Sequence, residues 1–441
     1  MKVISPANET VMKILKNFQK PGTKYRKLKY LVDAEVEEGV LLFNLFTREL
    51  VLLDKEEFGN AIENEYLRNQ WFIVPEECDE KEYVKTIRYM LQLRSNPQNT
   101  ITNYTIFTTT NCNARCYYCF EAGQKVKTMS VETASKVAEY IISHSNKEKV
   151  ILHWFGGEPL LNLTAIDTIC NRLIQAGIEY DSRMTTNGYL ITDSVIEKAI
   201  TTWKLNHVQI TLDGTEEIYN KIKSYINTLG SPYLTVINNI NLLLNNNIST
   251  TIRLNVDLNN AEDLLVLCEE LATRFRDNKK LSVYAHHLFS EKISMAEMYT
   301  PEEWQERDYA MLQIENKLEK YGLILRSSIS KKLKINHCKA DADNAITILP
   351  EGQIGVCDMH TDSEYIGNID NKDFHQEVIT KWKTVSPEIK ECNECYYYPE
   401  CIKLKNCTNE RDCYPIHRAQ NIRTLKRNIK YCYYKNLDNN P

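Results

Sequence analysis

The sequence predicts an α/β fold, a partial (β/α)6 barrel with an α+β domain before it and a cysteine-rich iron–sulfur domain after it. Three observations support this prediction. Six strand-like segments alternate with helix-like segments between residues 103 and 290, short strands followed by helices occupy residues 1–95, and eight cysteines lie between positions 338 and 432. Strands that alternate with helices favour a parallel sheet with right-handed crossovers. Six strands are too few for a complete eight-stranded barrel.

The N-terminal domain is expected to cover residues 1–95. Its strands form a short meander, because turn-like residues separate them. Helical patterns follow at residues 55–67 and 79–93, and the polar stretch 96–99 is expected to be a linker. The predicted strands are Tyr30–Glu35, Gly39–Asn44 and Glu49–Leu53.

The barrel is expected to cover residues 100–290, followed by a charged helical bridge over 291–336 and a final domain over 337–441. This last region has many thiols and few long apolar runs, which is typical of domains organised by metal. The predicted barrel strands are Tyr104–Thr109, Val150–Phe155, Ser182–Thr186, His207–Leu212, Thr250–Val256 and Leu281–Leu288. The predicted helices are Ser130–His144, Leu163–Ala176, Asp193–Thr201, Tyr233–Asn245 and Ala261–Phe275, with a terminal helix at Ile416–Tyr434.

Composition narrows the possible classes of function. The net charge of -5 comes with no concentrated basic face, so we expect no nucleic-acid partner. No apolar run approaches the roughly 20 residues of a membrane span, and the first residues lack the pattern of a signal peptide. We therefore expect a cytoplasmic protein with no membrane partner. In that reducing compartment, the fourteen cysteines indicate metal or redox sites rather than disulfides.

The most informative motif is a loop of three cysteines directly after the first barrel strand. Cys112, Cys116 and Cys119 have the spacing Cys-x3-Cys-x2-Cys. Iron–sulfur clusters normally take four cysteines, so three thiolates predict a four-iron cluster with one iron open to an exchangeable ligand. The alternative is a structural zinc site, but zinc usually takes four ligands and no fourth lies nearby.

This motif resembles that of the radical S-adenosylmethionine (radical SAM) superfamily. The resemblance implies a 4Fe–4S cluster whose open iron is chelated by S-adenosylmethionine. It further implies reductive cleavage to a 5′-deoxyadenosyl radical, which removes a hydrogen atom from the substrate. Tyr118 matches the aromatic position that packs near the adenine. Which residue of this chain acts directly on the substrate stays unknown.

A second motif follows the second predicted strand, where Gly156, Gly157 and Glu158 precede Pro159. In the radical SAM resemblance, this segment holds the methionine amino group, and its glycines allow the backbone to approach the ligand closely. Gly-Gly-Glu-Pro alone would be explained equally well by a turn. Its position after this strand and after the cysteine loop makes the functional interpretation the stronger one.

Further segments resemble parts of the family's cofactor or substrate pocket. Thr185 and Asn187 follow the third strand, and Asp213 follows the fourth. Turn formation by Asn-Gly and Asp-Gly explains these positions about equally well. Arg253, in the fifth strand, could reach the methionine carboxylate, although a solvent-facing arginine is the commoner case.

The C-terminal cysteines resemble the SPASM extension of radical SAM enzymes, which carries two auxiliary 4Fe–4S clusters. The spacing departs from the family pattern where five residues, not three, separate Cys401 from Cys407. The resemblance leaves the proximal cluster with three cysteines and an open or non-cysteine position, for which His337 is a candidate. Cys432 is expected to be an ordinary helix residue. The predicted ligands are Cys392, Cys395, Cys401 and Cys413 for the distal cluster and Cys338, Cys357 and Cys407 for the proximal one.

SPASM enzymes act mostly on peptides, and the resemblance extends to maturases of ribosomally made peptides. It implies a precursor peptide with a leader segment, a thioether or carbon–carbon cross-link, and an electron donor such as flavodoxin or ferredoxin. Residues 1–95 resemble, in layout, a winged-helix-like domain that takes the leader as an added strand. A cap without leader affinity is the alternative. Two other functions remain open, a sulfatase-maturating type of enzyme and a non-catalytic iron–sulfur electron-transfer protein.

Overall fold

A computed structural model describes residues 1–18, 22, 24–95, 100–288, 299–359, 364–371, 374–407, 413 and 415–439. The predicted linker at 96–99 and the first part of the predicted bridge, 291–298, lie outside these residues. The chain forms two compact units. The barrel unit comprises Gln98–Leu325 and Cys338–Thr384, and the terminal unit comprises Met1–Pro97, Arg326–His337 and Val385–Pro441. The four predicted domains stay a prediction.

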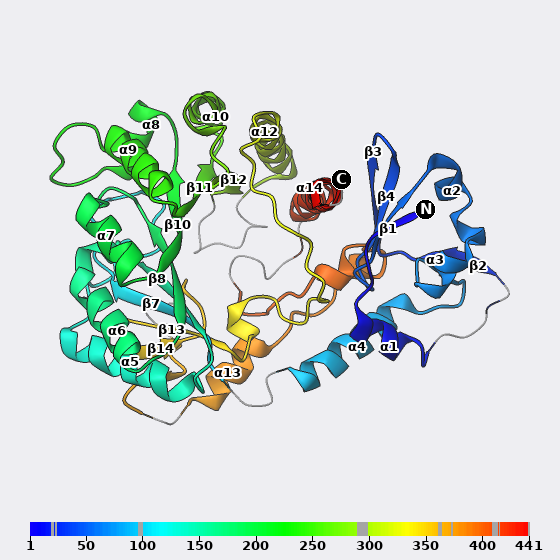
Figure 1. Cartoon of the computed structure of the whole chain (residues 1–441), viewed down its shortest axis with the longest axis horizontal. Helices are drawn as coiled ribbons and strands as arrows, with labels where there is room; N and C mark the ends of the chain where they lie inside the picture. The colour runs from blue at the N-terminus through cyan, green and yellow to red at the C-terminus, as the bar shows by residue number, and fades with distance from the viewer. Residues whose placement is uncertain are drawn as a thin grey trace. The chain divides into compact units, whose positions relative to one another are not determined.

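The barrel unit is built on a sheet of nine strands, in the order β12-β11-β10-β9-β8-β7-β13-β14-β15 (Figure 1). The six strands from β7 to β12 pair in parallel, which confirms the predicted partial barrel. These strands are β7 (Asn103–Thr109), β8 (Val150–Gly156), β9 (Tyr180–Thr186), β10 (Leu205–Leu212), β11 (Ser249–Val256) and β12 (Leu281–His287).

Helices cover one face of these strands. Along β8, the buried side chains of Val150, Leu152 and Trp154 alternate with more exposed ones, as expected for a strand with only one face against helices. Figure 1 shows α5, α6, α7 and α9 along the strands on that side. The helices are α5 (Val131–His144), α6 (Leu163–Gln175), α7 (Asp193–Thr201), α8 (Glu216–Lys223), α9 (Pro232–Asn245), α10 (Ala261–Phe275) and α12 (Pro301–Lys320), with a short 3-10 turn at Pro159–Asn162. Of these, α8 and α12 were not predicted individually.

The other face of the sheet is polar, and its side chains bond across neighbouring strands. His153 Nε2 lies 2.9 Å from Thr185 Oγ1, and His207 Nε2 lies 2.9 Å from Thr251 Oγ1. Groups that bond to one another across strands are held in fixed positions. Polar side chains on the open face are therefore linked across neighbouring strands.

Segments from the C-terminal half extend the sheet beyond the six predicted strands. Strand β13 (Ala345–Ile348) pairs in parallel with β7, and β14 (Gln353–Gly355) and β15 (Gly367–Asn368) continue it in antiparallel order. No strands were predicted here, because these are only two to four residues long. The remaining helical segments of the barrel unit are Lys339–Asp341 and α13 (Gln376–Lys383).

The terminal unit contains a four-stranded sheet in the order β1-β5-β4-β3 and a separate β2-β6 pair. The prediction of a single helix over 55–67 is wrong, because the structure has three short helices there instead. Asn64 is extended and its side chain accepts the N–H of Leu67 at 3.1 Å, which starts a new helix there. The strands are β1 (Lys2–Ser5), β2 (Tyr25–Lys27), β3 (Leu31–Val36), β4 (Gly39–Asn44), β5 (Leu50–Leu53) and β6 (Ile73–Pro75). The helical segments are α1 (Glu9–Leu15), α2 (Lys55–Gly59), Ala61–Glu63, α3 (Glu65–Asn69), α4 (Glu80–Arg94), Lys390–Asn393, Tyr398–Glu400 and α14 (Pro415–Asn439).

One hydrophobic core joins the two ends of the chain within the terminal unit. Ile429 and Tyr433 of α14 are buried in the same cluster as Val32 and Phe43 of the N-terminal sheet. Part of the buried apolar face of α14 therefore packs with residues that lie some 400 positions earlier. Among the described residues, no helix has the length and apolarity that a membrane span requires.

Candidate active site

The three-cysteine loop begins where β7 ends and precedes α5. The backbone N–H of Ala114 donates to Cys112 Sγ at 3.4 Å. Burial raises the pKa of the Cys112 thiol to about 12, and the neighbouring Cys116 and Cys119 add to this increase. Burial likewise raises the pKa of Cys119. The structure therefore brings the three predicted cluster cysteines within electrostatic range of one another.

Two glycines allow the segment after β8 to lie directly against the cysteine loop. The N–H of Gly157 donates to the Thr109 carbonyl at 3.0 Å, and the N–H of Glu158 donates to the Asn111 carbonyl at 2.9 Å. A Cβ on Gly156 would lie 2.3 Å from the Thr109 oxygen, and one on Gly157 would lie 2.3 Å from the Asn111 oxygen. The close approach predicted for these glycines is thus made to the backbone of the cysteine loop.

Glu158 is completely buried and fastens two loops together. Its carboxylate accepts the N–H of Leu160 at 3.0 Å, the hydroxyl of Thr186 at 2.8 Å and the N–H of Asn187 at 2.8 Å. Burial raises the pKa of Glu158 to about 7, and these hydrogen bonds limit the increase. The side chain is therefore already engaged with the end of β9. Its predicted pairing with a methionine ammonium stays a prediction.

Asn187 directly follows β9 and Thr185 lies within it. Their side chains bond to different parts of the barrel unit. The Asn187 amide donates to Asn113 Oδ1 at 2.6 Å and lies 3.8 Å from Cys112 Sγ, so it touches the cysteine loop. Thr185 faces the open side of the sheet, where it bonds to His153. The structure brings Asn187 to the predicted cluster site and leaves Thr185 on the open face of the sheet, bonded to His153.

Tyr118, which follows Cys116 by two positions, is held by a buried ion pair. Its hydroxyl donates to Asp213 Oδ2 at 2.7 Å and accepts from the Lys223 ammonium at 2.9 Å. Lys223 and Asp213 lie 2.9 Å apart, with side chains only 4% and 1% exposed. Burial alone would lower the pKa of Lys223, but the Asp213 carboxylate together with Tyr118, Cys116 and Tyr219 outweighs it and holds that pKa well above its usual value. The aromatic ring of the motif is thus fixed in place.

Lys223 also anchors the cysteine loop through the backbone. Its carbonyl accepts the N–H of Arg115 at 2.8 Å, and the N–H of Ile226 donates to the Asn113 carbonyl at 2.9 Å. Lys223 was not predicted as a site residue, because a single lysine outside any motif gives no signal in the sequence. Asp213 was predicted as a residue of the cofactor or substrate pocket. In the structure its side chain forms an ion pair with this lysine.

Several buried polar atoms on the cysteine loop and on β11 lack a hydrogen-bond partner among the described residues. They include Asn113 Nδ2 and Glu121 Oε1 on the segment after β7, and Arg253 Nε and Asn255 Oδ1 on β11. Buried polar atoms are normally paired, so such atoms indicate room for a polar ligand. Arg253 also contacts His286 Nδ1 at 3.0 Å. The donors and acceptors fit a zwitterion such as S-adenosylmethionine, with Arg253 suited to its carboxylate.

The cysteines predicted for auxiliary clusters are divided between the two units. Within the terminal unit, burial raises the pKa values of Cys401 and Cys413, and Cys395 lies close enough to both thiols to add to the increase. Cys392 adds in the same way to that of Cys413. The four predicted distal ligands therefore form one neighbourhood. Cys432 lies elsewhere on α14, where its sulfur accepts the N–H of Ile329 at 3.2 Å.

For the proximal set, Cys338 and Cys357 both lie near Lys339 in the barrel unit. In the terminal unit, Cys407 Sγ lies 4.0 Å from His337 Nε2. In the part of the chain that the structure describes, no three Cys, His, Asp or Glu side chains are arranged around a single metal-ion position. The cluster assignments accordingly rest on cysteine spacing and mutual proximity.

The partial parallel barrel and the cysteine loop after its first strand together define the radical SAM class of domain. Residues 106–271 match the Radical SAM superfamily, and the chain thus contains a radical SAM domain. Among curated proteins, the radical SAM cyclopropyl synthase TigE of Paramaledivibacter caminithermalis is 26% identical over 228 residues. That match covers 45% of this chain and 46% of TigE, so it spans about half the length of the relative.

Solved structures share the fold at low sequence identity. The structure of anSMEcpe with bound AdoMet has a TM-score of 0.57 at 16% identity, and covers 76% of this chain and 98% of that one. A further anSMEcpe structure, with bound AdoMet and the Cp18Cys peptide, has a TM-score of 0.55 at 16% identity, covering 77% and 98%. Streptococcus suis SuiB bound to S-adenosylmethionine has a TM-score of 0.53 at 12% identity, and covers 88% and 98%.

Replacing Lys223 by Met should destabilise the barrel unit strongly. The change leaves the buried Asp213 carboxylate without its counter-ion, and breaking a buried pair in this way typically costs about 3–5 kcal/mol. Denaturant unfolding of the metal-free protein, monitored in the barrel unit, would measure the loss. Lys198→Met is the matched control, because Lys198 pairs with Asp167 at 2.6 Å but is 41% exposed, and should cost less than about 1 kcal/mol. Equal unfolding free energies for the two variants would contradict this role of Lys223.

Proposed function

We propose that this protein is a radical SAM maturase that modifies a ribosomally made precursor peptide, forming a thioether or carbon–carbon cross-link or a related modification. The observation that carries the proposal is the cysteine loop, held by Gly157, Glu158 and Lys223 at the C-terminal ends of the barrel strands, where such barrels carry out chemistry. When bound, a 4Fe–4S cluster with S-adenosylmethionine supplies a 5′-deoxyadenosyl radical for hydrogen abstraction.

The chain's own residues would bind the cluster and S-adenosylmethionine and orient them toward the substrate. Cys112, Cys116 and Cys119 would hold the cluster. Arg253 has an unpaired buried Nε for the methionine carboxylate, and the Asp213–Lys223 pair fixes the ring of Tyr118. Hydrogen-bonded polar groups along β8 to β12 would line the space next to the substrate. The protein thus contributes positioning, while the difficult chemistry belongs to the cofactor.

A peptide substrate is supported by the resemblance to peptide maturases and by the fold shared with anSMEcpe, a structure of which holds a peptide. The terminal unit offers two sheet edges, β1 and β3, at which an extended leader could pair as an added strand. Two auxiliary clusters are part of the proposal. The cysteines Cys392, Cys395, Cys401 and Cys413 would hold the distal one, and Cys338, Cys357 and Cys407 would contribute to the proximal one.

The test uses anaerobically reconstituted protein, dithionite, S-adenosylmethionine and the short peptides encoded beside the gene. We expect 5′-deoxyadenosine to form, and one peptide to lose the mass of two hydrogen atoms for each cross-link. Mass spectrometry measures both products. Formation of 5′-deoxyadenosine without modification of any such peptide would count against a precursor peptide as substrate. An absence of 5′-deoxyadenosine would reject the radical mechanism itself and favour an electron-transfer protein.

A further inference from the structure

Basic side chains of the N-terminal residues hold the cysteine segment of the terminal unit, residues 388–401. This segment carries three of the predicted distal ligands, Cys392, Cys395 and Cys401. The Lys29 ammonium donates to the Asn393 carbonyl at 2.7 Å, and the Lys81 ammonium donates to Asn393 Oδ1 at 2.7 Å. Cations therefore lie around the site at which the distal cluster is proposed.

Arg88, on α4, makes the most extensive of these contacts. Its guanidinium donates to the carbonyl of Lys334 at 3.2 Å, to that of Tyr398 at 2.9 Å and to that of Pro399 at 2.7 Å. Burial raises the pKa of the Cys401 thiol, and Arg88 lies close enough to oppose this increase. Three backbone bonds thus fix the guanidinium within electrostatic range of a predicted distal ligand.

The partners of Arg88 are neutral, which distinguishes it from the other cations. Three N-terminal cations each form an ion pair with a carboxylate of the cysteine segment. These pairs are Lys29–Glu394, Lys81–Glu388 and Arg48–Glu400. Among the described residues, Arg88 forms no ion pair, and its acceptors are three carbonyl oxygens. A partly buried cation is costly without a counter-ion, so the position of Arg88 indicates that an anion belongs beside it.

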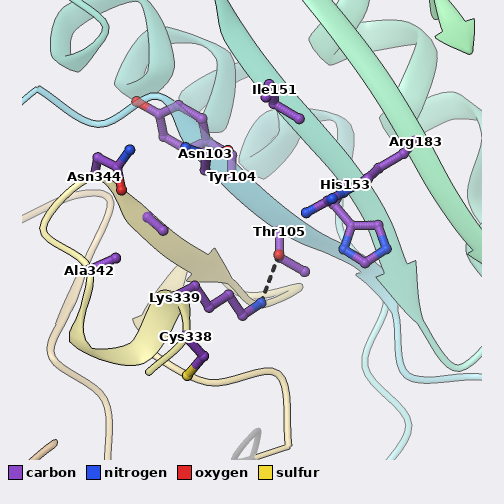
Figure 2. A pocket seen from close by; sticks show the side chains of 11 residues that line it. Asn103, Tyr104, Thr105, Ile151, His153, Arg183, Cys338, Lys339, Ala342 and Asn344 are labelled. Carbon is purple, nitrogen blue, oxygen red and sulfur yellow. Dashed lines mark hydrogen bonds between the residues drawn. The ribbon is translucent and has the colours of Figure 1, made fainter. Parts of the chain in front are cut away.

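A cation beside a predicted ligand in the barrel unit provides a contrast. Lys339 directly follows Cys338, and its ammonium donates to Thr105 Oγ1 at 2.8 Å (Figure 2). The same ammonium forms an ion pair with Asp358. This lysine is thus paired with a carboxylate of its own unit, whereas Arg88 is not.

We propose that Arg88 is the counter-ion of the distal cluster and raises its reduction potential. The inference rests on the proposed function, because it requires the distal 4Fe–4S cluster that forms part of it. Four thiolates outweigh the positive charge of a 4Fe–4S core, so this cluster is an anion, and one added electron makes it more negative. A fixed cation nearby stabilises the reduced form more than the oxidised form. The N-terminal residues thus help to set the electron affinity of a cluster.

The test measures the reduction potential of the distal cluster in the reconstituted holoenzyme. Dithionite supplies one electron to the cluster, and electron paramagnetic resonance follows the reduced form. The distal signal is the one that is missing from a Cys395→Ala variant. Arg88→Gln keeps an amide donor for the carbonyls but removes the charge. At the midpoint potential of the parent, we expect the ratio of reduced to oxidised cluster in this variant to fall about ten-fold, which equals about 59 mV for one electron.

Three further variants separate the charge of Arg88 from its structural bonds. Arg88→Lys should stay close to the potential of the parent, because it keeps the cation while losing donors. Gln92→Glu should lower the potential while leaving the bonds of Arg88 in place, because a carboxylate one helical turn further along α4 can pair with the guanidinium. Arg94→Gln is the matched control and should leave the potential unchanged, because Arg94 is exposed on the same helix.

Equal shifts in Arg88→Gln and Arg88→Lys would show that Arg88 only supports the fold, and would overturn the proposal. So would an unchanged potential in Gln92→Glu, which decides the matter if Arg88→Gln does not assemble the cluster. A parent with no signal that depends on Cys395 would reject the distal cluster, and the role of Arg88 with it. Peptide products are measured in the same preparations. A potential that depends on Arg88, in an enzyme that modifies no peptide, would support the counter-ion and reject peptide maturation.

Discussion

Replacing Cys112, Cys116 and Cys119 together by Ala should abolish S-adenosylmethionine cleavage and remove about four of about twelve irons, one 4Fe–4S cluster of three. The three thiols share one loop, and Cys116 and Cys119 lie close enough to Cys112 to raise its pKa. No other cysteine of the barrel unit lies on that loop. Iron analysis and 5′-deoxyadenosine formation by the anaerobically reconstituted variant measure the two effects.

The control for this variant is a pair of substitutions at buried thiols outside every motif, Cys170→Ala in α6 and Cys268→Ala in α10. Both should retain the full iron content and cofactor cleavage. Cys432→Ala should also change the iron content little, because the sulfur of Cys432, on α14, accepts the backbone N–H of Ile329. Unaltered cleavage in the triple variant would refute the assignment of the first cluster.

The sequence was sufficient for the elements that carry a strong local pattern. Val150–Phe155 alternates in polarity and precedes Gly-Gly, and the structure places β8 there within one residue. The same holds for the cysteine loop, whose spacing, aromatic Tyr118 and position after the first strand resemble the radical SAM motif. Local patterns succeed here because each strand of a parallel barrel meets its neighbours in chain order.

What local pattern could not predict depends on long-range packing. Lys223 reads as an ordinary surface residue of an amphipathic helix, yet the fold places it beside Asp213 and under the cysteine loop. The short strand β13 was missed because its pairing partner, β7, lies some 240 residues earlier.

Long-range packing also holds the terminal unit together. Deleting residues 1–95 should therefore unfold the rest of this unit. The deletion removes one side of the core that buries Ile429 and Tyr433. It also removes Arg88, which donates to the carbonyls of Tyr398 at 2.9 Å and Pro399 at 2.7 Å. Losing these partners leaves α14 and the distal cysteines without a folded scaffold.

The barrel unit has its own core, and so the truncated protein should retain the first cluster, about four irons, while losing those of the distal one. Iron analysis, together with limited proteolysis of the segment after residue 385, measures the outcome. Tyr89→Ala is the control within the deleted region, because Tyr89 is 62% exposed on α4 and contributes little to the core. It should leave the iron content unchanged. A truncated protein with full iron content and a protease-resistant C-terminal segment would show that residues 1–95 are a separable domain. Leader recognition could then be assayed by adding them back in trans.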